Sequence, residues 1–193
     1  MLEATPAHPW VGRGALKLVH ALDHWPVSVE GRVVLDVGAS TGGFTEVCLQ
    51  RGAAQVYAVD VGREQLHQSV AADPRVINMS ATDARNLTSA LIPRSPDLIV
   101  ADVSFISLAK AMPAALALAA DGADLLALVK PQFEVGRAKV GKGGIVSDTA
   151  ARTEALEAVK AFIASSGWIV QATADSPIEG GDGNHEFLLW ARR

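Results

Sequence analysis

The chain has 193 residues, of which 49% are hydrophobic and 20% are charged, and its formal net charge at pH 7 is −4. This composition is typical of a globular protein with one core and excludes a disordered chain. The acidic balance excludes a uniformly basic nucleic-acid-binding surface, although it is compatible with a local basic patch. The single cysteine, Cys48, permits no internal disulfide, which favours a reducing cytoplasm.

The sequence shows neither a targeting signal nor a membrane span. Residues 1–12 contain two prolines and no hydrophobic periodicity, so we expect a linker or tail there, without the apolar run of a secretory signal. The most apolar stretch, residues 111–129, is interrupted by proline, glycine and aspartate and is too broken to cross a membrane. We therefore expect one domain over residues 13–193.

A helix is predicted from Arg13 to the residue before Pro26, because apolar residues recur there at the spacing of one helical face. Its opposite face carries a basic stripe that includes Lys17. His20 and His24 have the spacing of a helical zinc pair, but the general-base glutamate of that motif and a third ligand are missing. No metal site is therefore predicted.

Short β-rich runs then alternate with helical patterns. Strands are predicted at residues 33–37, 55–59, 76–79, 98–102, 125–129, 169–173 and 186–191. Helices are predicted at residues 44–51, 63–70, 108–119 and 148–166, with a weaker helical pattern at 87–91. Repeated β-α units form a mostly parallel sheet with helices on both faces. The sequence therefore predicts a single doubly wound α/β domain.

The first predicted strand ends in a glycine-rich loop, made of Asp36, Gly38, Ala39, Ser40, Thr41, Gly42, Gly43 and Phe44. The glycines allow a sharp turn and a close approach of the backbone to a ligand, which in doubly wound sheets binds beyond the carboxyl ends of the strands. Ser40 stands where the dinucleotide fingerprint has its second glycine, and no Gly-Lys-Ser/Thr follows as in a phosphate-binding loop. A tight turn without a ligand is the alternative interpretation.

Acidic residues follow the next two predicted strands. Asp60, next to Val61, lies 24 residues after Asp36, where a carboxylate can accept both ribose hydroxyls of a nucleoside. Asp83, followed by Ala84, is placed to meet an adenine amino group. Three acidic residues beside a glycine loop favour a ligand without phosphates, such as S-adenosylmethionine (SAM), which carries a sulfonium and an ammonium. They disfavour NAD, and with it an oxidoreductase.

Five segments resemble the TlyA group of FtsJ-like RNA methyltransferases, which are often labelled haemolysins: residues 11–18, 36–44, 101–108, 128–134 and 183–187. The resemblance implies a seven-stranded Rossmann-like sheet with an antiparallel last strand. It implies SAM-dependent methylation of a ribose 2′-hydroxyl in ribosomal RNA, on cytidine. It further implies a catalytic tetrad of Lys17, Asp102, Lys130 and Glu186, with Asp102 also beside the cofactor. Members of the group carry a small RNA-binding domain ahead of the methyltransferase, which this sequence does not include.

The roles of these four residues can also be argued from their positions and their chemistry, apart from the resemblance. Asp102 and Lys130 end the fourth and fifth predicted strands and should project at the ligand edge of the sheet. If the last strand is antiparallel, as the resemblance implies, its first residue, Glu186, reaches the same edge. A sugar hydroxyl loses its proton during methyl transfer, and a nearby ammonium favours the alkoxide. We expect Lys130, oriented by Asp102, to supply that ammonium, and Lys17 and Glu186 to hold the ribose in line. A solvated Lys17 and a helix-capping Asp102 are the alternatives.

Further features bear on competing functions. The run after Asp102 is Val-Ser-Phe, which lacks the paired prolines typical of enzymes that methylate exocyclic amines.

From Lys130 to Lys142 there are four cations and one acid, so the glycine-rich residues 136–144 are predicted either to bind RNA phosphates or to form a solvated loop. The sequence has neither an apolar span nor a basic amphipathic anchor, so it does not support a membrane-active haemolysin. A SAM-binding module without catalysis is disfavoured by the complete tetrad. The oligomeric state is not predicted.

Overall fold

The computed structural model describes residues 8–181 and 183–193, which form one seven-stranded sheet in the order β3-β2-β1-β4-β5-β7-β6. The strands are β1 (Val33–Val37), β2 (Gln55–Val59), β3 (Val76–Met79), β4 (Leu98–Ala101), β5 (Asp124–Val129), β6 (Ile169–Asp175) and β7 (Phe187–Arg192). β7 is antiparallel to β5 and β6, whereas the four pairs among the first five strands are parallel. The predicted mostly parallel sheet with an antiparallel last strand is confirmed.

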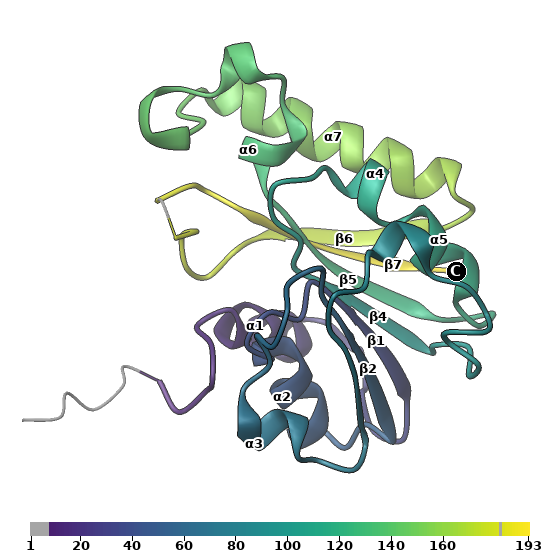
Figure 1. Cartoon of the computed structure of the whole chain (residues 1–193). Coiled ribbons are helices and arrows are strands. Elements are labelled where there is room, and N and C mark those ends of the chain that lie inside the picture. The colour runs from purple at the N-terminus through teal and green to yellow at the C-terminus, as the bar shows by residue number, and fades with distance from the viewer. Residues whose placement is uncertain (1–7, 182) are drawn as a thin grey trace, which may run out of the picture.

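Helices cover both faces of this sheet (Figure 1). On one face lie α1 (Ala15–His24), α2 (Gly43–Gln50) and α3 (Gln68–Ala71). On the other lie α4 (Leu108–Ala111), α5 (Pro113–Leu118) and α7 (Thr149–Ser165). The remaining short elements are α6 (Pro131–Glu134) and the 3-10 turns η1 (Ala84–Asn86), η2 (Arg137–Lys139) and η3 (Lys142–Gly144). Within residues 8–181 and 183–193, no helix is both long and apolar enough to span a membrane.

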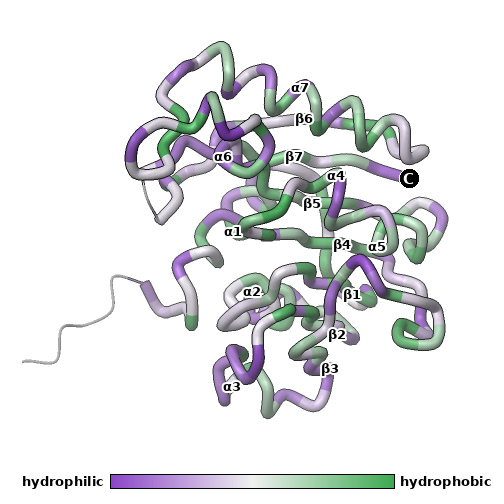
Figure 2. The backbone as a smooth tube through the Cα atoms, turned by 45° about the horizontal axis from the view of Figure 1, so that its top comes forward, coloured by the Kyte–Doolittle hydropathy of each residue, from purple (hydrophilic) through white to green (hydrophobic). Residues whose placement is uncertain are grey.

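The central strands are buried along their whole length. Every residue of β1, β4 and β5 is buried, and the apolar colouring follows these strands in Figure 2. A strand covered on both sides selects apolar residues at successive positions rather than at alternate ones. This explains why the sequence shows them as short continuous apolar runs.

Three of the predicted helical segments differ from the structure. The pattern at 108–119 is broken into α4 and α5, because Pro113 has no N–H to extend α4 and instead occupies the first turn of α5. Only α3 forms where a helix was predicted at 63–70, since Glu64 adopts a left-handed φ of 50° that an α-helix does not admit. The weak pattern at 87–91 ends in a turn, in which the Leu91 N–H donates to the Thr88 carbonyl at 3.0 Å.

The start of α7 follows its predicted capping. The carboxylate of Asp148 accepts the N–H of Ala150 at 2.9 Å, as expected of an N-cap aspartate. The helix ends just before Gly167, whose φ of 84° lies in the left-handed region that glycine adopts readily. The local sequence is therefore sufficient to define this helix at both ends.

The order of the strands reverses between β1 and β4. From β1 the chain moves outward through β2 and β3 and then returns to β4 on the other side of β1. Val37 and Ala101, the last residues of the two strands, are neighbours in the parallel register. A crevice for ligands forms beyond the carboxyl ends of two strands at such a reversal. The fold thus places the loops after β1 and β4 on either side of one crevice.

The segment that leads into α1 is fixed over the β1–α2 loop. The Val11 N–H donates to the carboxylate of Glu46 in α2 at 2.8 Å, and Trp10 and Val11 pack against the core on this face. A Cβ on Gly12 would lie 2.7 Å from Thr41 Oγ1, so the two segments are in close contact. Residues 10–12, which the sequence analysis assigned to the linker or tail, therefore lie against the domain.

Candidate active site

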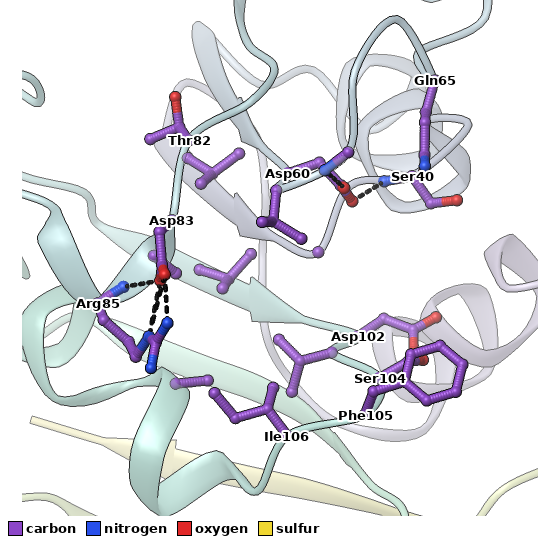
Figure 3. A pocket seen from close by; sticks show the side chains of 18 residues that line it. Ser40, Asp60, Gln65, Thr82, Asp83, Arg85, Asp102, Ser104, Phe105 and Ile106 are labelled. Atoms are coloured by element: carbon purple, nitrogen blue, oxygen red, sulfur yellow. Dashed lines mark hydrogen bonds and ion pairs between the residues drawn. The ribbon is translucent and has the colours of Figure 1, made fainter.

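A pocket of about 460 Å³ opens beyond the carboxyl ends of β1, β2, β3 and β4. Figure 3 shows Ser40 and Asp60 on one side of it, Asp83 and Arg85 on a second, and Asp102 and Phe105 on a third. Of the predicted cofactor residues, those that line the pocket are Gly38, Ser40, Asp60, Val61, Asp83, Ala84 and Asp102. The other predicted cofactor residues lie outside the lining, in β1, in the loop between β1 and α2, or in the first turn of α2: Asp36, Ala39, Thr41, Gly42, Gly43 and Phe44.

Two glycines allow the β1–α2 loop to fold tightly. Gly38 and Gly42 have φ values of 87° and 97°, which side-chain-bearing residues rarely adopt. A Cβ on Gly38 would lie 2.6 Å from the carbonyl oxygen of Asp102, and one on Gly42 would lie 2.7 Å from Leu66. The loop therefore needs glycine because it packs directly against the end of β4 and against the segment before α3.

Asp60 joins the loops that follow β1 and β2. Its carboxylate accepts the N–H of Ser40 at 2.8 Å and the N–H of Gly62 at 2.7 Å (Figure 3). A carboxylate offers about four acceptor positions. Asp60 is therefore held in place by the backbone and retains acceptor capacity toward the pocket.

Asp83 is engaged by Arg85, which the sequence analysis did not identify. The Arg85 Nη2 atom donates to Asp83 Oδ2 at 2.6 Å, and the backbone N–H of Arg85 donates to Oδ1 of the same carboxylate at 2.9 Å (Figure 3). Hydrogen bonds from Arg85 lower the pKa of Asp83 to about 2. The pair thus keeps an ionised carboxylate and a cation together at the pocket wall. The Asp-x-Arg spacing was the available signal, because an aspartate often caps a turn two residues ahead.

Asp36 is a fully buried carboxyl group at the base of the loop. Its Oδ2 atom accepts the hydroxyl of Thr45 at 2.6 Å, and Oδ1 has no hydrogen-bond partner among the described residues. Burial raises the pKa of Asp36 from its ordinary value of 3.8 to about 7, and the charges of Asp102 and Asp60 act in the same direction. Asp36 is therefore protonated in the folded protein at mildly acidic pH, where it is ionised in the unfolded chain.

Asp36→Asn is expected to change how stability depends on pH. From pH 5 to about 7 the folded wild type holds a proton that the unfolded chain has lost, so its free energy of unfolding falls as the pH rises to the folded pKa of about 7 and then levels off. At about 1.4 kcal/mol per pKa unit, the variant should gain about 3 kcal/mol relative to wild type between pH 5 and 8. Urea unfolding at both values measures this. Parallel pH dependences of the two proteins would refute it.

The four residues of the predicted tetrad form two ion pairs. Lys17 Nζ lies 2.5 Å from Glu186 Oε2, and Lys130 Nζ lies 2.6 Å from Asp102 Oδ1. The members come from α1, the start of β7, the end of β5 and the end of β4. Lys17, Glu186 and Lys130 are 6%, 2% and 9% exposed. Lys17 of the predicted basic stripe is therefore buried, unlike the solvated lysine of the alternative interpretation, because this side of α1 faces the residue that precedes β7.

Two features of the backbone bring the pairs together. Val129 and Phe187 are partners in the antiparallel β5–β7 ladder, so the residues that follow and precede them, Lys130 and Glu186, lie at the same end of the two strands. A Cβ on Gly14, just ahead of α1, would lie 3.2 Å from Asp102 Oδ2. The start of α1 therefore lies beside the second pair. The structure thus brings the four predicted residues to the same end of the sheet, where Asp102 forms part of the pocket wall and Lys17, Lys130 and Glu186 lie outside the lining.

Asn184 connects the loop before β7 to the end of the basic, glycine-rich loop at residues 136–144. This buried side chain accepts the Val146 N–H at 3.0 Å and donates to the Gly144 carbonyl at 2.9 Å. Asn184 lies in the resembling segment 183–187, but its structural role could not be predicted from the sequence, because its partners lie about 40 residues away. These bonds fix the segment that carries Glu186.

The basic segment from Lys130 to Lys142 contains four cations, and two of them are paired with carboxylates in the structure. Lys130 belongs to the tetrad and Lys139 forms an ion pair with Glu154. Arg137 and Lys142 have no carboxylate partner within the described part of the chain. Across the same described residues, no group of three His, Cys, Asp or Glu side chains is arranged to hold a metal ion.

The fold and the pocket define the class of protein. The structure of magnesium protoporphyrin IX methyltransferase from Synechocystis with bound S-adenosylhomocysteine superposes with a TM-score of 0.65, covering 99% of this chain and 88% of that one. At 15% sequence identity this similarity concerns the fold alone, which is that of SAM-dependent methyltransferases. The model of the FtsJ-like methyltransferase family matches residues 10–193, and the chain belongs to that family.

Individual relatives are similar over nearly the whole chain. The 16S/23S rRNA (cytidine-2′-O)-methyltransferase TlyA of Mycobacterium tuberculosis is 51% identical over 183 residues, which cover 95% of this chain and 68% of the relative. A solved structure of a candidate hemolysin from Streptococcus thermophilus is 43% identical with a TM-score of 0.93, covering 98% of this chain and 69% of that one. The chain thus spans about two thirds of the length of both relatives.

Proposed function

We propose that the protein transfers a methyl group from SAM to the 2′-hydroxyl of a cytidine ribose in ribosomal RNA. The observation that carries this proposal is the buried ion pair Lys17–Glu186 together with the half-buried pair Lys130–Asp102, whose aspartate lines the pocket. Buried charges are costly unless they are paired, and such arrangements occur often at functional sites. The relative TlyA, named for cytidine 2′-O-methylation of 16S and 23S rRNA, supports the substrate.

The residues of the pocket fit SAM. Asp60, Asp83 and Asp102 line it together with one cation, Arg85, so carboxylates outnumber cations in the lining. Its electrostatic potential therefore suits a ligand with a sulfonium and an ammonium and opposes a pyrophosphate. Gly38 lines the pocket without a side chain and lets the loop pack against the backbone of Asp102, and Asp60 retains acceptors for ribose hydroxyls. When bound, SAM supplies a methyl group activated by its sulfonium.

Lys130 is placed to act on the hydroxyl that receives the methyl group. Held by Asp102, its positive charge stabilises the negative charge that develops on the 2′-oxygen as the O–H bond breaks and the O–CH₃ bond forms. When Lys130 is an ammonium, the proton leaves to a water molecule; when Lys130 reacts as the neutral amine, its Nζ atom accepts the proton. Lys17 and Glu186 hold the ribose, which keeps the oxygen in line with the methyl group.

Phe105 offers an aromatic face to the RNA beside this site. Its side chain is 91% exposed although it lines the pocket, and its ring lies 5.2 Å from that of Phe133. Its φ of 66° is a strained conformation for a bulky residue, and such strain is concentrated at functional sites. Unstacked RNA bases bind by stacking on exposed aromatic rings. We infer that Phe105 stacks on the base of the target nucleotide.

Phe105→Ala is expected to raise KM for RNA about tenfold, since stacking on an aromatic ring contributes roughly 1–3 kcal/mol per base. Phe105→Trp should keep KM near the wild-type value because it preserves an aromatic face. Leu91→Ala removes an exposed apolar side chain outside the pocket and serves as the matched control. Steady-state methylation of ribosomal subunits measures these values. An unchanged KM in Phe105→Ala would eliminate the stacking role.

Calorimetric titration with SAM tests the proposed cofactor, and NAD is the control ligand. Heat of binding with SAM and none with NAD is the expected result. Binding of NAD alone would contradict the proposal, because the acidic pocket should repel a pyrophosphate. A positive SAM titration is then followed by methyl transfer to ribosomal subunits.

A further inference from the structure

Lys130 has a second partner besides Asp102. Its Nζ atom donates to the hydroxyl oxygen of Ser104 at 2.8 Å, in addition to its ion pair with Asp102 at 2.6 Å. Ser104 lies two residues beyond Asp102 in the loop after β4, and it lines the pocket (Figure 3). Ser104 is not one of the four residues of the tetrad.

The loop that carries Ser104 is held against the segment after Lys130. The carboxylate of Glu134 in α6 accepts the N–H of Leu108 at the start of α4 at 2.9 Å. The rings of Phe105 and Phe133 form a second contact between the same two segments. Ser104 is therefore part of a loop whose position relative to Lys130 is fixed on both sides.

The hydrogen bond to Ser104 determines how the lysine ammonium is turned. A lysine ammonium has three N–H groups in a tetrahedral arrangement. The contact with Asp102 is an ion pair without hydrogen-bond geometry, since Asp102 Oδ1 has no hydrogen-bond partner among the described residues, so it does not stop rotation about the Cε–Nζ bond. The hydrogen bond to Ser104 stops this rotation, and the position that faces the substrate then has one direction. In the ammonium it holds an N–H that can face the 2′-oxygen, and in the neutral amine it holds the lone pair that can accept the proton.

We propose that Ser104 is a positioning residue that orients the Nζ atom of Lys130 toward the substrate hydroxyl. This inference rests on the proposed 2′-O-methyl transfer. Ser104 acts through Lys130 and has no contact with the methyl group. Loss of its hydroxyl leaves the charge of Lys130 and its ion pair with Asp102 in place, so it should affect the rate of the chemical step rather than the binding of either substrate.

The test compares Ser104→Ala, Ser104→Thr and Ser107→Ala in methylation of ribosomal subunits. Ser104→Ala is expected to lower kcat about tenfold to a hundredfold, the range for a misplaced catalytic group, with KM for RNA and Kd for SAM close to wild type. Ser104→Thr retains the hydroxyl and should restore kcat. Ser107, in the same loop, makes no side-chain cap to α4, so its alanine variant should match wild type. A wild-type kcat in Ser104→Ala, or equal losses in the alanine and threonine variants, would overturn the proposal.

A spectroscopic measurement separates this inference from the proposed function. The ¹H–¹⁵N signal of the Lys130 ammonium, assigned by its loss in Lys130→Met, should exchange faster with water in Ser104→Ala and not in Ser104→Thr. An unchanged signal in Ser104→Ala would overturn the contact whatever the activity. A changed signal in a protein that methylates no ribosomal RNA would support the contact while contradicting the proposed function.

Discussion

Lys130→Ala is expected to lower kcat for methyl transfer about 10³-fold, with little change in the dissociation constant for SAM. General acid–base and electrostatic assistance to a reacting group each contribute about 10²–10³-fold or more, and Lys130 is placed to supply them. Lys130 does not line the pocket, which supports the expectation that cofactor binding survives its loss. Single-turnover methylation and calorimetric titration with SAM measure the two quantities.

Lys110→Ala is the matched control for this experiment. Lys110 is an exposed lysine of α4, and its replacement should leave both kcat and SAM affinity near their wild-type values. A collapse of SAM affinity in Lys130→Ala would show that the residue serves the cofactor rather than the hydroxyl. Near wild-type turnover would remove Lys130 from the chemistry altogether.

Lys17→Met is expected to lower the free energy of unfolding by about 3–5 kcal/mol. The substitution leaves the carboxylate of Glu186, which is 2% exposed, buried without its partner at 2.5 Å. The double variant Lys17→Met, Glu186→Gln removes both charges and should recover most of the lost stability. Urea unfolding monitored by circular dichroism measures both effects.

The same pair of variants separates folding from catalysis. The double variant is expected to be folded and to bind SAM, yet to methylate RNA poorly, because both residues that are proposed to hold the ribose are changed. Lys110→Met, an exposed replacement in α4, should change stability by no more than about 0.5 kcal/mol. A single Lys17→Met variant as stable as wild type would show that the pair is not held in the buried geometry described above.

Most of the sheet was predictable because burial on both faces imprints apolar runs on the sequence. The predicted strands at 33–37 and 55–59 coincide with β1 and β2, and the one at 76–79 coincides with β3, an edge strand that is only half-buried. The helix predicted at 63–70 failed for a tertiary reason, since Leu66 in this loop packs close to Gly42 and Glu64 takes a left-handed φ. Helical spacing in the sequence carries no information about such contacts.

The site could be predicted only where residues form motifs. The tetrad came from the resemblance to a family, and the ends of the strands explained why Asp102 and Lys130 share an edge. The burial of Lys17 was not predictable, because its partner Glu186 lies 169 residues away and helical periodicity assigns lysine to the polar face. Ser104 is similar, since its contact with Lys130 depends on the packing of two loops.

The most direct test of the proposed function is the chemical identity of the methylated product. Ribosomal subunits that lack the modification are incubated with the protein and SAM carrying a labelled methyl group, and the RNA is digested to nucleosides and analysed by mass spectrometry. The proposal predicts the label in 2′-O-methylcytidine, at linkages that resist alkaline hydrolysis. A label on a base, or no label in RNA from a protein that binds SAM, would contradict it.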